Sequence, residues 1–303
     1  MTTASGSGRF SLEVYLLGIA FSTIWSSAFV VGKFAVGVAP PLWLLGVRFF
    51  LAGLVLMAML RLMGRSLPRN RADWLSGIGL GILNNAAYLG ICFYAFGHVT
   101  AGMVAMIASL TPMATALMAH PILGEKLSPR KLIGIALGIF GTWIVLRGRL
   151  GGSGVTVDDP FWLAIMFLAM LCLSGGTILY RARATGADPV AMNTVQTLAS
   201  AVAVIIPALF LEDFGAIHWT EPRFILVQLY MIGVVTICGL LMWFRLIRLA
   251  GAGAASAFHF LNPALALSMA WVTLGEPVAW QDLLGLAPIA IGILLVTRAA
   301  APR

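Results

Sequence analysis

The sequence predicts an all-α polytopic membrane protein: ten transmembrane helices, arranged as two inverted five-helix repeats, with both termini in the cytoplasm. Three observations predict this fold: the apolar composition, the number of long apolar runs, and a copy of part of the first half in the second. Of the 303 residues, 60% are hydrophobic and only 10% are charged. A soluble protein of this size needs a larger charged surface, so the lipid bilayer is the better solvent.

The apolar runs have the length of membrane spans. A helix that crosses the bilayer needs about 20 mostly apolar residues, and the chain offers ten such stretches. We expect them near residues 12–34, 41–60, 74–96, 100–123, 131–147, 160–180, 190–211, 224–246, 252–274 and 282–297. The three cysteines, Cys92, Cys172 and Cys238, fall inside these runs without a CxxC pattern or a neighbouring His pair. We therefore expect no disulfide, no metal and no cofactor.

The basic residues favour one side of the membrane. With the N-terminus inside, the inner connections carry Arg9, Arg61, Arg65, Arg69, Arg71, Lys126, Arg130, Lys131, Arg181, Arg183, Arg245, Arg248, Arg298 and Arg303. The outer connections carry only Arg147, Arg149 and Arg223, with Lys33 near the outer end of the first span. This bias follows the positive-inside rule and places both termini in the cytoplasm. It accounts for the net charge of +8, and no basic patch is left for nucleic acid.

The second half repeats the first. Residues 110–125 read LTPMATALMAHPILGE and residues 261–276 read LNPALALSMAWVTLGE, 151 positions later. Between Leu110–Arg147 and Leu261–Arg298, 13 of 38 positions are identical. We therefore divide the single transmembrane domain into repeats of five spans at 12–147 and 160–298, joined by a polar, Gly-containing linker. Because five is odd, the second repeat is inverted, and such repeats suit alternating access to the two faces.

Several motifs follow the same order in both halves. TrpSer stands at 25–26, Arg48 lies in the second span, and FYAFGHVTAG (93–102) and WFRLIRLAGAGAAS (243–256) each precede Leu-x-Pro and LGE. Over essentially the whole chain these residues resemble the drug/metabolite transporter superfamily, in its ten-helix EamA-type branch, and most of all the YddG-type exporters of amino acids. The resemblance implies a transporter in the cell (inner) membrane. The family usually has Gly where Ser26 stands, which implies looser helix packing there.

Polar and aromatic residues inside the spans are the candidates for substrate binding, because polar groups in hydrocarbon usually face a cavity or a neighbouring helix. The candidates are Trp25, Asn84, Tyr88, Ser109, Thr111, His259, Phe260 and Asn262. Asn84 and Tyr88 are four residues apart and so share a helix face. The alternative for each is structural: Trp25 fills the core, His259 is hydrogen-bonded in the interior, Asn84 lies in a close helix contact, and the hydroxyls bond to their own helix.

Pro112 and Pro263 occupy matching places in the fourth and ninth spans. A proline inside a helix leaves the carbonyl four residues earlier, here that of Ala108 or His259, without its amide donor and kinks the helix. We expect the two prolines to act as hinges, or to expose those carbonyls to substrate. The alternative is a static kink that helps packing.

Arg48, Glu125 and Glu276 are expected to have structural or gating roles. Arg48 should reach outward or bond to backbone carbonyls, and Gln196 occupies a comparable place in the second repeat. Each Glu follows the end of a span, where it could cap the next helix or fix the turn; proton coupling or gating is the alternative. No carboxylate falls in the middle of a predicted span, which favours a zwitterionic or neutral small-molecule substrate.

The sequence therefore predicts export of amino acids, including aromatic or apolar ones, by alternating access and as a passive carrier. The direction of transport comes from the resemblance alone. A proton-coupled drug or metabolite antiporter, with His259 or the two Glu residues as relay, is the first alternative, and a non-transporting sensor or scaffold is the second. An enzyme is not expected, because the chain has no HExxH, no GxSxG and no paired carboxylates in the spans.

Overall fold

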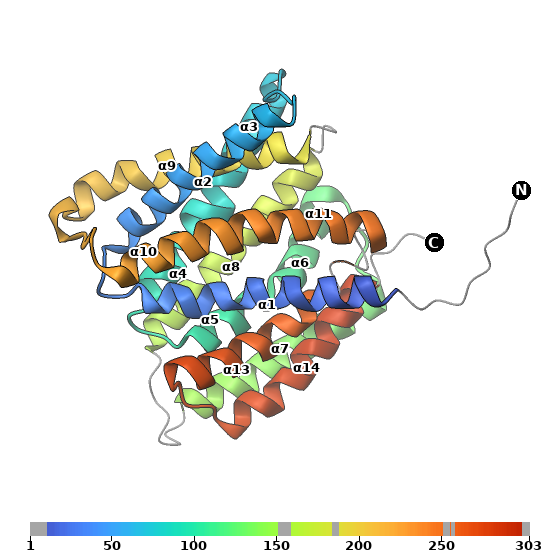
Figure 1. Cartoon of the computed structure of the whole chain (residues 1–303). Coiled ribbons are helices and arrows are strands. Elements are labelled where there is room, and N and C mark those ends of the chain that lie inside the picture. The colour runs from blue at the N-terminus through green and yellow to red at the C-terminus, as the bar shows by residue number, and fades with distance from the viewer. Residues whose placement is uncertain (1–10, 151–158, 184–187, 251–254, 256–257, 299–303) are drawn as a thin grey trace, which may run out of the picture.

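The computed structural model describes residues 11–150, 159–183, 188–250, 255 and 258–298. These residues form helices and connecting turns, with no strand among them, and the helices pack into one bundle (Figure 1). Within the described residues, eight helices are long and apolar enough to cross a membrane, and Trp280–Val296 is a shorter apolar helix. The chain is therefore a multi-pass α-helical membrane protein. The start of α1 and the end of α14 lie at the same end of the bundle (Figure 1).

Six of the predicted spans coincide with uninterrupted α-helices. They are α1 (Leu12–Phe34), α2 (Pro41–Leu62), α7 (Pro129–Leu150), α8 (Pro160–Ala182), α9 (Pro189–Leu211) and α14 (Trp280–Arg298). A short 3-10 turn, η2 (Phe214–Ala216), follows α9. Several helices begin with Pro at the first position, where the missing amide hydrogen has no partner to lose.

The other four spans are interrupted near their middle. The third consists of α3 (Arg71–Leu80), the π-helix η1 (Gly81–Ala87) and α4 (Tyr88–Ala95), and the eighth of α10 (Pro222–Leu229), the π-helix η3 (Tyr230–Cys238) and α11 (Gly239–Ala250). The fourth consists of α5 (Ala101–Ala108) and α6 (Thr111–Leu123), and the described part of the ninth of the 3-10 helix η4 (Phe258–Leu261) and α13 (Asn262–Leu274). The start of the predicted ninth run lies largely outside the described residues. All four interruptions fall at matching places in the two repeats.

Pro112 and Pro263 do not sit inside continuous helices. Each is the second residue of a new helix, α6 or α13, after a break in the chain of helical hydrogen bonds. An amide at this position lacks an intrahelical acceptor in any helix, so proline is tolerated there at little cost. Each proline therefore stands at the second position of the half-helix that follows the interruption, and the kink expected at each proline stays a prediction.

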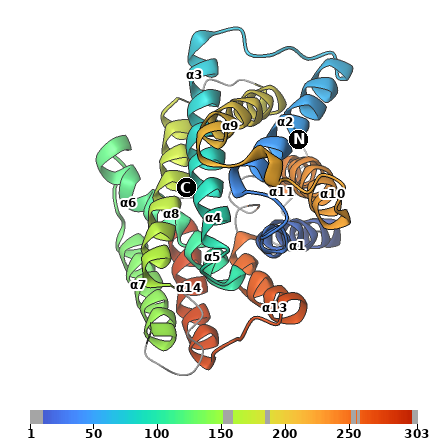
Figure 2. The ribbon, with the colours of Figure 1, turned by 90° about the vertical axis from the view of Figure 1, so that its left-hand side faces the viewer.

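The two halves interlock through equivalent helices. Helix α7 packs along α14, α2 packs along α9, and the contact of α6 with α8 is matched by that of α13 with α1. Figure 2 shows these neighbours from one end of the bundle. Four glycines of the copied segments lie where α7 meets α14: a Cβ on Gly134 would lie 2.6 Å from the Gly292 carbonyl oxygen, and one on Gly141 would lie 2.6 Å from that of Gly285. Small residues here allow the backbones to touch, as membrane helices require.

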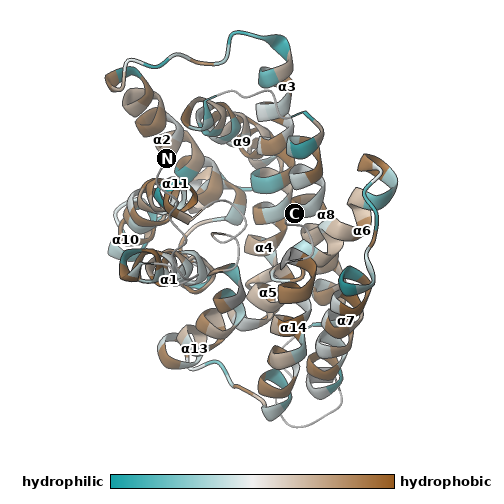
Figure 3. Cartoon of the chain, turned by 90° about the vertical axis from the view of Figure 1, so that its right-hand side faces the viewer, coloured by the Kyte–Doolittle hydropathy of each residue, from teal (hydrophilic) through white to brown (hydrophobic). Residues whose placement is uncertain are grey.

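The outer faces of the bundle are apolar. Hydrophobic colour covers most helical surface, and hydrophilic colour gathers at helix ends and connections (Figure 3). Large side chains such as Phe210, Leu226 and Val272 are exposed by 84%, 65% and 72%. Such continuous apolar exposure is unfavourable in water and is expected against lipid.

Candidate functional site

The broken fourth and ninth spans receive hydrogen bonds from the first helix of the opposite repeat. The Ser26 hydroxyl of α1 donates to the Asn262 carbonyl at 3.2 Å. The Ser174 hydroxyl of α8 lies 3.3 Å from the Thr111 carbonyl and shares its proton between this carbonyl and that of Met170 in its own helix, at 2.9 Å. Ser22 also donates to the Phe258 carbonyl at 2.7 Å. Ser26 is fully buried, so the residue that stands where the family usually has Gly lies within this helix contact.

An aromatic box lies beside the break in the ninth span, formed by Phe21 and Trp25 of α1, Trp243 of α11 and His259 of η4. The His259 ring centroid lies 5.3, 5.8 and 5.2 Å from those of Phe21, Trp25 and Trp243, and Phe21 stacks on Trp243 at 5.0 Å. The Asn262 side-chain amide donates to His259 Nδ1 at 2.9 Å, and Asn262 Oδ1 is buried without a hydrogen bond. This box thus brings together three predicted candidates, Trp25, His259 and Asn262.

Phe21 and Trp243 were not among the predicted site residues. Both follow the helical spacing of ordinary core aromatics, so the sequence offered no sign of their contact with His259. The side chain of Phe260, which was a candidate, lies outside the described residues.

Asn84 lies in the π-helix η1 of the third span. It is half-buried, and its Oδ1 is buried without a hydrogen bond against Gly176 of α8. Tyr88, the first residue of α4, is 5% exposed. A π-helix bonds each residue to the fifth one along, which alters the spacing of four on which the shared face of Asn84 and Tyr88 was predicted. The neighbouring Asn85 donates to the Ser200 hydroxyl of α9 at 3.0 Å.

Ser109 and Thr111 bond to their own chain. The Ser109 hydroxyl donates to the Met106 carbonyl at 2.6 Å, and the Thr111 hydroxyl donates to the Ala108 carbonyl at 2.5 Å. The expectation that Pro112 leaves the Ala108 carbonyl free is therefore wrong, because Thr111 supplies the missing donor. Local bonds of this kind are the usual way a hydroxyl satisfies an interrupted helix.

The two π-helices form matching polar contacts with the second helix of the opposite repeat. Arg48 of α2 donates from Nη2 to the Thr236 hydroxyl of η3 at 3.5 Å, and Gln196 of α9 donates to the side-chain Oδ1 of Asn85 in η1 at 3.5 Å. Arg48 is 8% exposed and its Nε has no hydrogen bond. It therefore neither reaches outward nor bonds a backbone carbonyl, but contacts a side chain on the neighbouring helix.

Glu276 connects α5 to the end of α1. We call the cluster of Glu276, Lys33 and the first amides of α5 the Glu276 latch. Its carboxylate accepts from the Ala101 amide at 2.8 Å and the Gly102 amide at 3.2 Å. Lys33 Nζ lies 3.4 Å from Glu276 Oε1 and donates to the Val99 carbonyl at 2.6 Å. A carboxylate at a helix N-terminus is stabilised by the unbonded amides and the dipole. Glu276 thus caps α5 of the other repeat and not α14, the helix that follows it.

Glu125 follows the end of α6 and contacts two basic residues. We call the cluster of Glu125, Arg181 and Lys131 the Glu125 latch. Glu125 forms ion pairs with Arg181 at the end of α8 and with Lys131, the latter at 3.3 Å. The Glu125 side chain is 27% exposed, against 9% for Glu276. Glu125 and Arg181 hold the same places in their repeats as Glu276 and Lys33, so the two latches are equivalent in chemistry but unequal in burial.

The described part of the chain contains no group of three or more His, Cys, Asp or Glu side chains that could hold a metal ion. Its acidic residues lie at helix ends or in connections. What the interior offers is a set of amides, hydroxyls and aromatic rings around four helix breaks, arranged in matching pairs. Such a set can bind a small polar or aromatic molecule, and it holds no nucleophile paired with a base.

Matching polar contacts in two repeats of a multi-pass membrane protein are typical of small-molecule carriers. The chain belongs to the EamA-like transporter family, whose model matches residues 12–147 and again residues 160–298. It is therefore a membrane transporter of small molecules, and the names of its family and relatives denote transporters and not enzymes.

The relatives are similar over nearly the whole chain. The chain is 26% identical to the uncharacterized transporter YvbV of Bacillus subtilis, over 92% of this chain and 90% of the relative. It is 26% identical to the uncharacterized inner membrane transporter YedA of Escherichia coli, over 95% and 92%. It is also 25% identical to a "probable amino-acid metabolite efflux pump" of Salmonella typhimurium, over 92% and 93%. A solved crystal structure shares the fold, with a TM-score of 0.66, 22% identity, and coverage of 95% of this chain and 97% of that one.

Proposed function

We propose that the protein carries small zwitterionic molecules, amino acids above all, across the inner membrane by alternating access as a passive exporter. The observation that carries this proposal is the pair of latches. Each latch joins the end of a broken span to the first helix of the opposite repeat, and only the Glu276 latch is buried, with its carboxylate on the amides of α5. Opening one latch and burying the other would convert this arrangement into the one related by the pseudo-two-fold axis between the repeats, in which the binding site opens to the other side of the membrane.

The helix breaks supply the moving parts. Two turn residues, Ser109 and Leu110, lie between α5 and α6, and the 3-10 helix η4 leads directly into α13. We expect each half-helix to swing about its proline while the other half stays packed. The restart at Pro112 or Pro263 needs no hydrogen bond across the break. The hinge role of the two prolines thus rests on the helix breaks and not on free carbonyls.

The choice of an amino acid rests on the interior chemistry and on one relative. Asn84 and Asn262 offer buried carbonyl oxygens without partners, which suit an ammonium group, and the aromatic box suits an apolar or aromatic side chain. The described spans hold no carboxylate at mid-depth that would select a cation over a zwitterion. The relative named an amino-acid metabolite efflux pump supports the same class of substrate.

Locking the closed end tests alternating access. A Cβ on Gly102 would lie 3.7 Å from Leu267 Cα, so cysteines in the Gly102→Cys/Leu267→Cys pair are close enough to be tested for disulfide formation. In a background without the three native cysteines, we expect the oxidised pair to abolish amino-acid counterflow in proteoliposomes and reduction to restore it. Binding should persist in the locked form, seen as thermal stabilisation by substrate. The two single cysteine variants are the controls, and undiminished counterflow in the oxidised pair would contradict the mechanism.

A substrate panel separates the proposed carrier from a coupled antiporter. Counterflow should be measured with labelled aromatic, aliphatic and charged amino acids and with a cationic drug, with and without a pH gradient. We expect zwitterionic amino acids to exchange without a gradient. Strict dependence on the gradient, or transport of the cation alone, would replace this proposal with proton-coupled antiport.

A further inference from the structure

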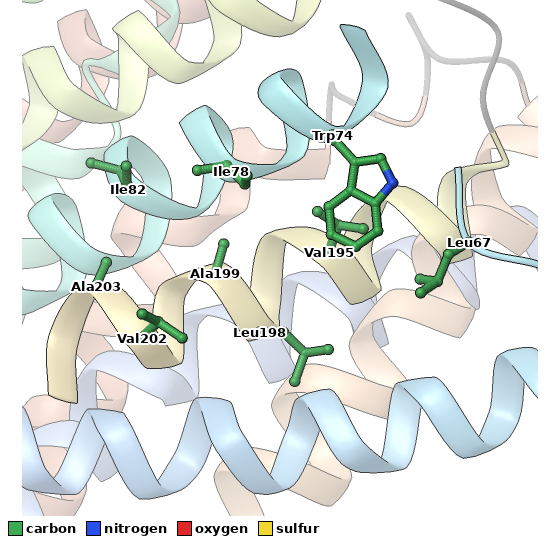
Figure 4. Close-up of a pocket in the computed structure, with 9 residues that line it drawn as sticks. All are labelled: Leu67, Trp74, Ile78, Ile82, Val195, Leu198, Ala199, Val202 and Ala203. Atoms are coloured by element: carbon green, nitrogen blue, oxygen red, sulfur yellow. The ribbon is translucent and has the colours of Figure 1, made fainter. Parts of the chain in front are cut away.

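An apolar groove runs along the outside of the bundle between the third span and α9 (Figure 4). It has a volume of about 460 Å³. Trp74, Ile78 and Ile82 form one wall, Ala199 and Ala203 lie along the other, and Leu67 lies at one end. Ile82 and Val202 on its rim are 46% and 59% exposed. The groove therefore faces the surroundings of the bundle, which in a membrane protein are lipid.

Small side chains on α9 produce the groove. Ala199 and Ala203 are one turn apart on its outer face, and the equivalent positions of α2, 148 residues earlier, hold Leu51 and Val55. Beneath the groove the two helices touch, since a Cβ on Gly81 would lie 2.5 Å from the Gln196 carbonyl oxygen. The floor is thus closed by backbone, while the rim is left open by the two alanines.

The groove has the length of one lipid leaflet. From Trp74 to Ile82, and from Val195 to Ala203, eight residues rise about 12 Å along each helix. One leaflet of hydrocarbon is about 15 Å deep, half of the roughly 30 Å core. Both helices begin at the end of the groove where Trp74 lies (Figure 4), so the groove runs from one membrane surface toward the middle.

Two arginines, Arg69 and Arg71, lie in the sequence between Leu67 and Trp74, two residues that line the groove. Arg69 and Arg71 are exposed, and neither forms an ion pair within the described residues, whereas Arg65 pairs with Asp188 at 2.8 Å. The Trp74 indole donates to the Pro68 carbonyl at 2.8 Å, which ties the segment bearing Arg69 to the end of the groove. Arg71 begins α3, where the helix dipole disfavours a cation, so helix stability does not explain its presence. A phosphate group would satisfy both guanidinium groups.

We propose that the groove binds an anionic phospholipid, with one acyl chain along α3, η1 and α9 and its phosphate against Arg69 and Arg71. Such a lipid would hold together the two helices whose inner faces carry the Asn85–Ser200 hydrogen bond. Anionic lipids bind at basic sites between membrane helices for the same electrostatic reason.

Fluorescence of Trp74 tests the site. The purified full chain is reconstituted in vesicles with increasing mole fractions of phosphatidylglycerol or phosphatidylcholine brominated on the acyl chain. The Trp74 contribution is the difference from the Trp74→Phe variant. We expect brominated phosphatidylglycerol to quench Trp74 at a roughly tenfold lower mole fraction than brominated phosphatidylcholine at low salt. Equal quenching by the two lipids would overturn the proposal, and so would no quenching by either, as when a second copy covers the groove.

Two pairs of substitutions locate the lipid. Arg69→Gln with Arg71→Gln, both on the surface, should remove the roughly tenfold preference for phosphatidylglycerol. Ala199→Leu with Ala203→Val, which copy the residues of α2, should remove the strong quenching by filling the groove. Leu51→Ala, on the equivalent lipid-facing site of α2, is the matched control and should change neither. Wild-type preference in both double variants would overturn the site.

Discussion

Replacing Glu276 with Gln should open the Glu276 latch. The change keeps the shape of the side chain and one carbonyl oxygen for the amides of α5, but it removes the charge. Lys33, whose side chain is 23% exposed, then loses its carboxylate partner. Helix α5 is buried along residues 101–107, and its first amides at Ala101 and Gly102 are held by Glu276. Weakening this cap should free the end of α5 to move.

The size of the effect follows from the lost charge. Hydrogen bonds to a charged group contribute about 1 kcal/mol more than neutral ones, and Glu276 accepts two of them. The ion pair with Lys33 is partly screened by exposure and adds up to about 1 kcal/mol. The closed state should therefore lose roughly 2–3 kcal/mol, which is roughly a 30- to 150-fold shift toward the open state.

Thiol labelling measures this shift. Ala105 of α5 is 2% exposed, so a cysteine placed there in a background free of the native cysteines should react slowly with a membrane-impermeant maleimide. Glu276→Gln should raise the labelling rate by the factor given above, and from the Glu276 side only. Labelling that stays at the slow rate would mean that Glu276 does not hold α5.

Glu125→Gln is the matched control at the other end of the bundle. Its ion pairs are more exposed and contribute about 0.2–1 kcal/mol, so access at its own end should rise less than about fivefold. Labelling of a cysteine at position 105 should stay the same or fall, because opening the Glu125 end favours closure at the Glu276 end. If Glu125→Gln raised labelling at position 105 as much as Glu276→Gln, the two latches could not act at opposite faces.

Three further substitutions probe the packing, each by thermal unfolding in detergent. Gly176→Ala should destabilise the protein by more than about 1 kcal/mol, because its Cβ would clash with Asn84 Oδ1. Gly175→Ala should be tolerated, because the nearest neighbour of its Cβ would be 3.8 Å away; equal losses of stability would contradict this contact. Ser26→Ala and Ser174→Ala should each cost about 0.6 kcal/mol, the usual value for a hydrogen bond between membrane helices, and a loss above about 2 kcal/mol would show that more than the hydrogen bond is involved. Arg48→Gln should keep or raise the stability of the protein. A charge near the middle of a span costs roughly 2.5–3.5 kcal/mol, and Arg48 has a single long hydrogen bond. Strong destabilisation would show that Arg48 stabilises the fold.

Much of the helical pattern could be predicted from the sequence, because apolar runs and the copied segment report directly on spans and repeats. The glycines that match between residues 134–141 and 285–292 also have a visible cause, since they meet across the contact of α7 with α14. The π-helices could not be predicted in this way. No proline marks η1 or η3, and the polar residues Asn84, Asn85 and Thr236 that they contain occur equally in regular helices. The extra residue per turn depends on which helices pack against them.

The site was only partly predictable for a related reason. The interval of 151 residues aligns the later helices of each repeat but not the first two, which are 148 apart, as Ser26 is from Ser174 and Lys33 from Arg181. A comparison of the halves that allowed for this gap would have identified the serines and the basic partners of the two latches. The contact of His259 with Phe21 and Trp243 has no such signal, because it joins helices far apart in the sequence.

The unequal burial of the two latches has a specific source in the sequence. Lys131 and Asp282 occupy equivalent positions, 151 apart, just after their respective latches. Lys131 pairs with Glu125 at 3.3 Å, so this carboxylate is shared between Lys131 of its own repeat and Arg181 of α8. Asp282 instead accepts from the Ala279 amide at 2.9 Å and caps its own helix, which leaves Glu276 to reach α5. The two ends of the bundle therefore differ by two charge units at one position, and this difference favours closure at Glu276, the end that is buried here.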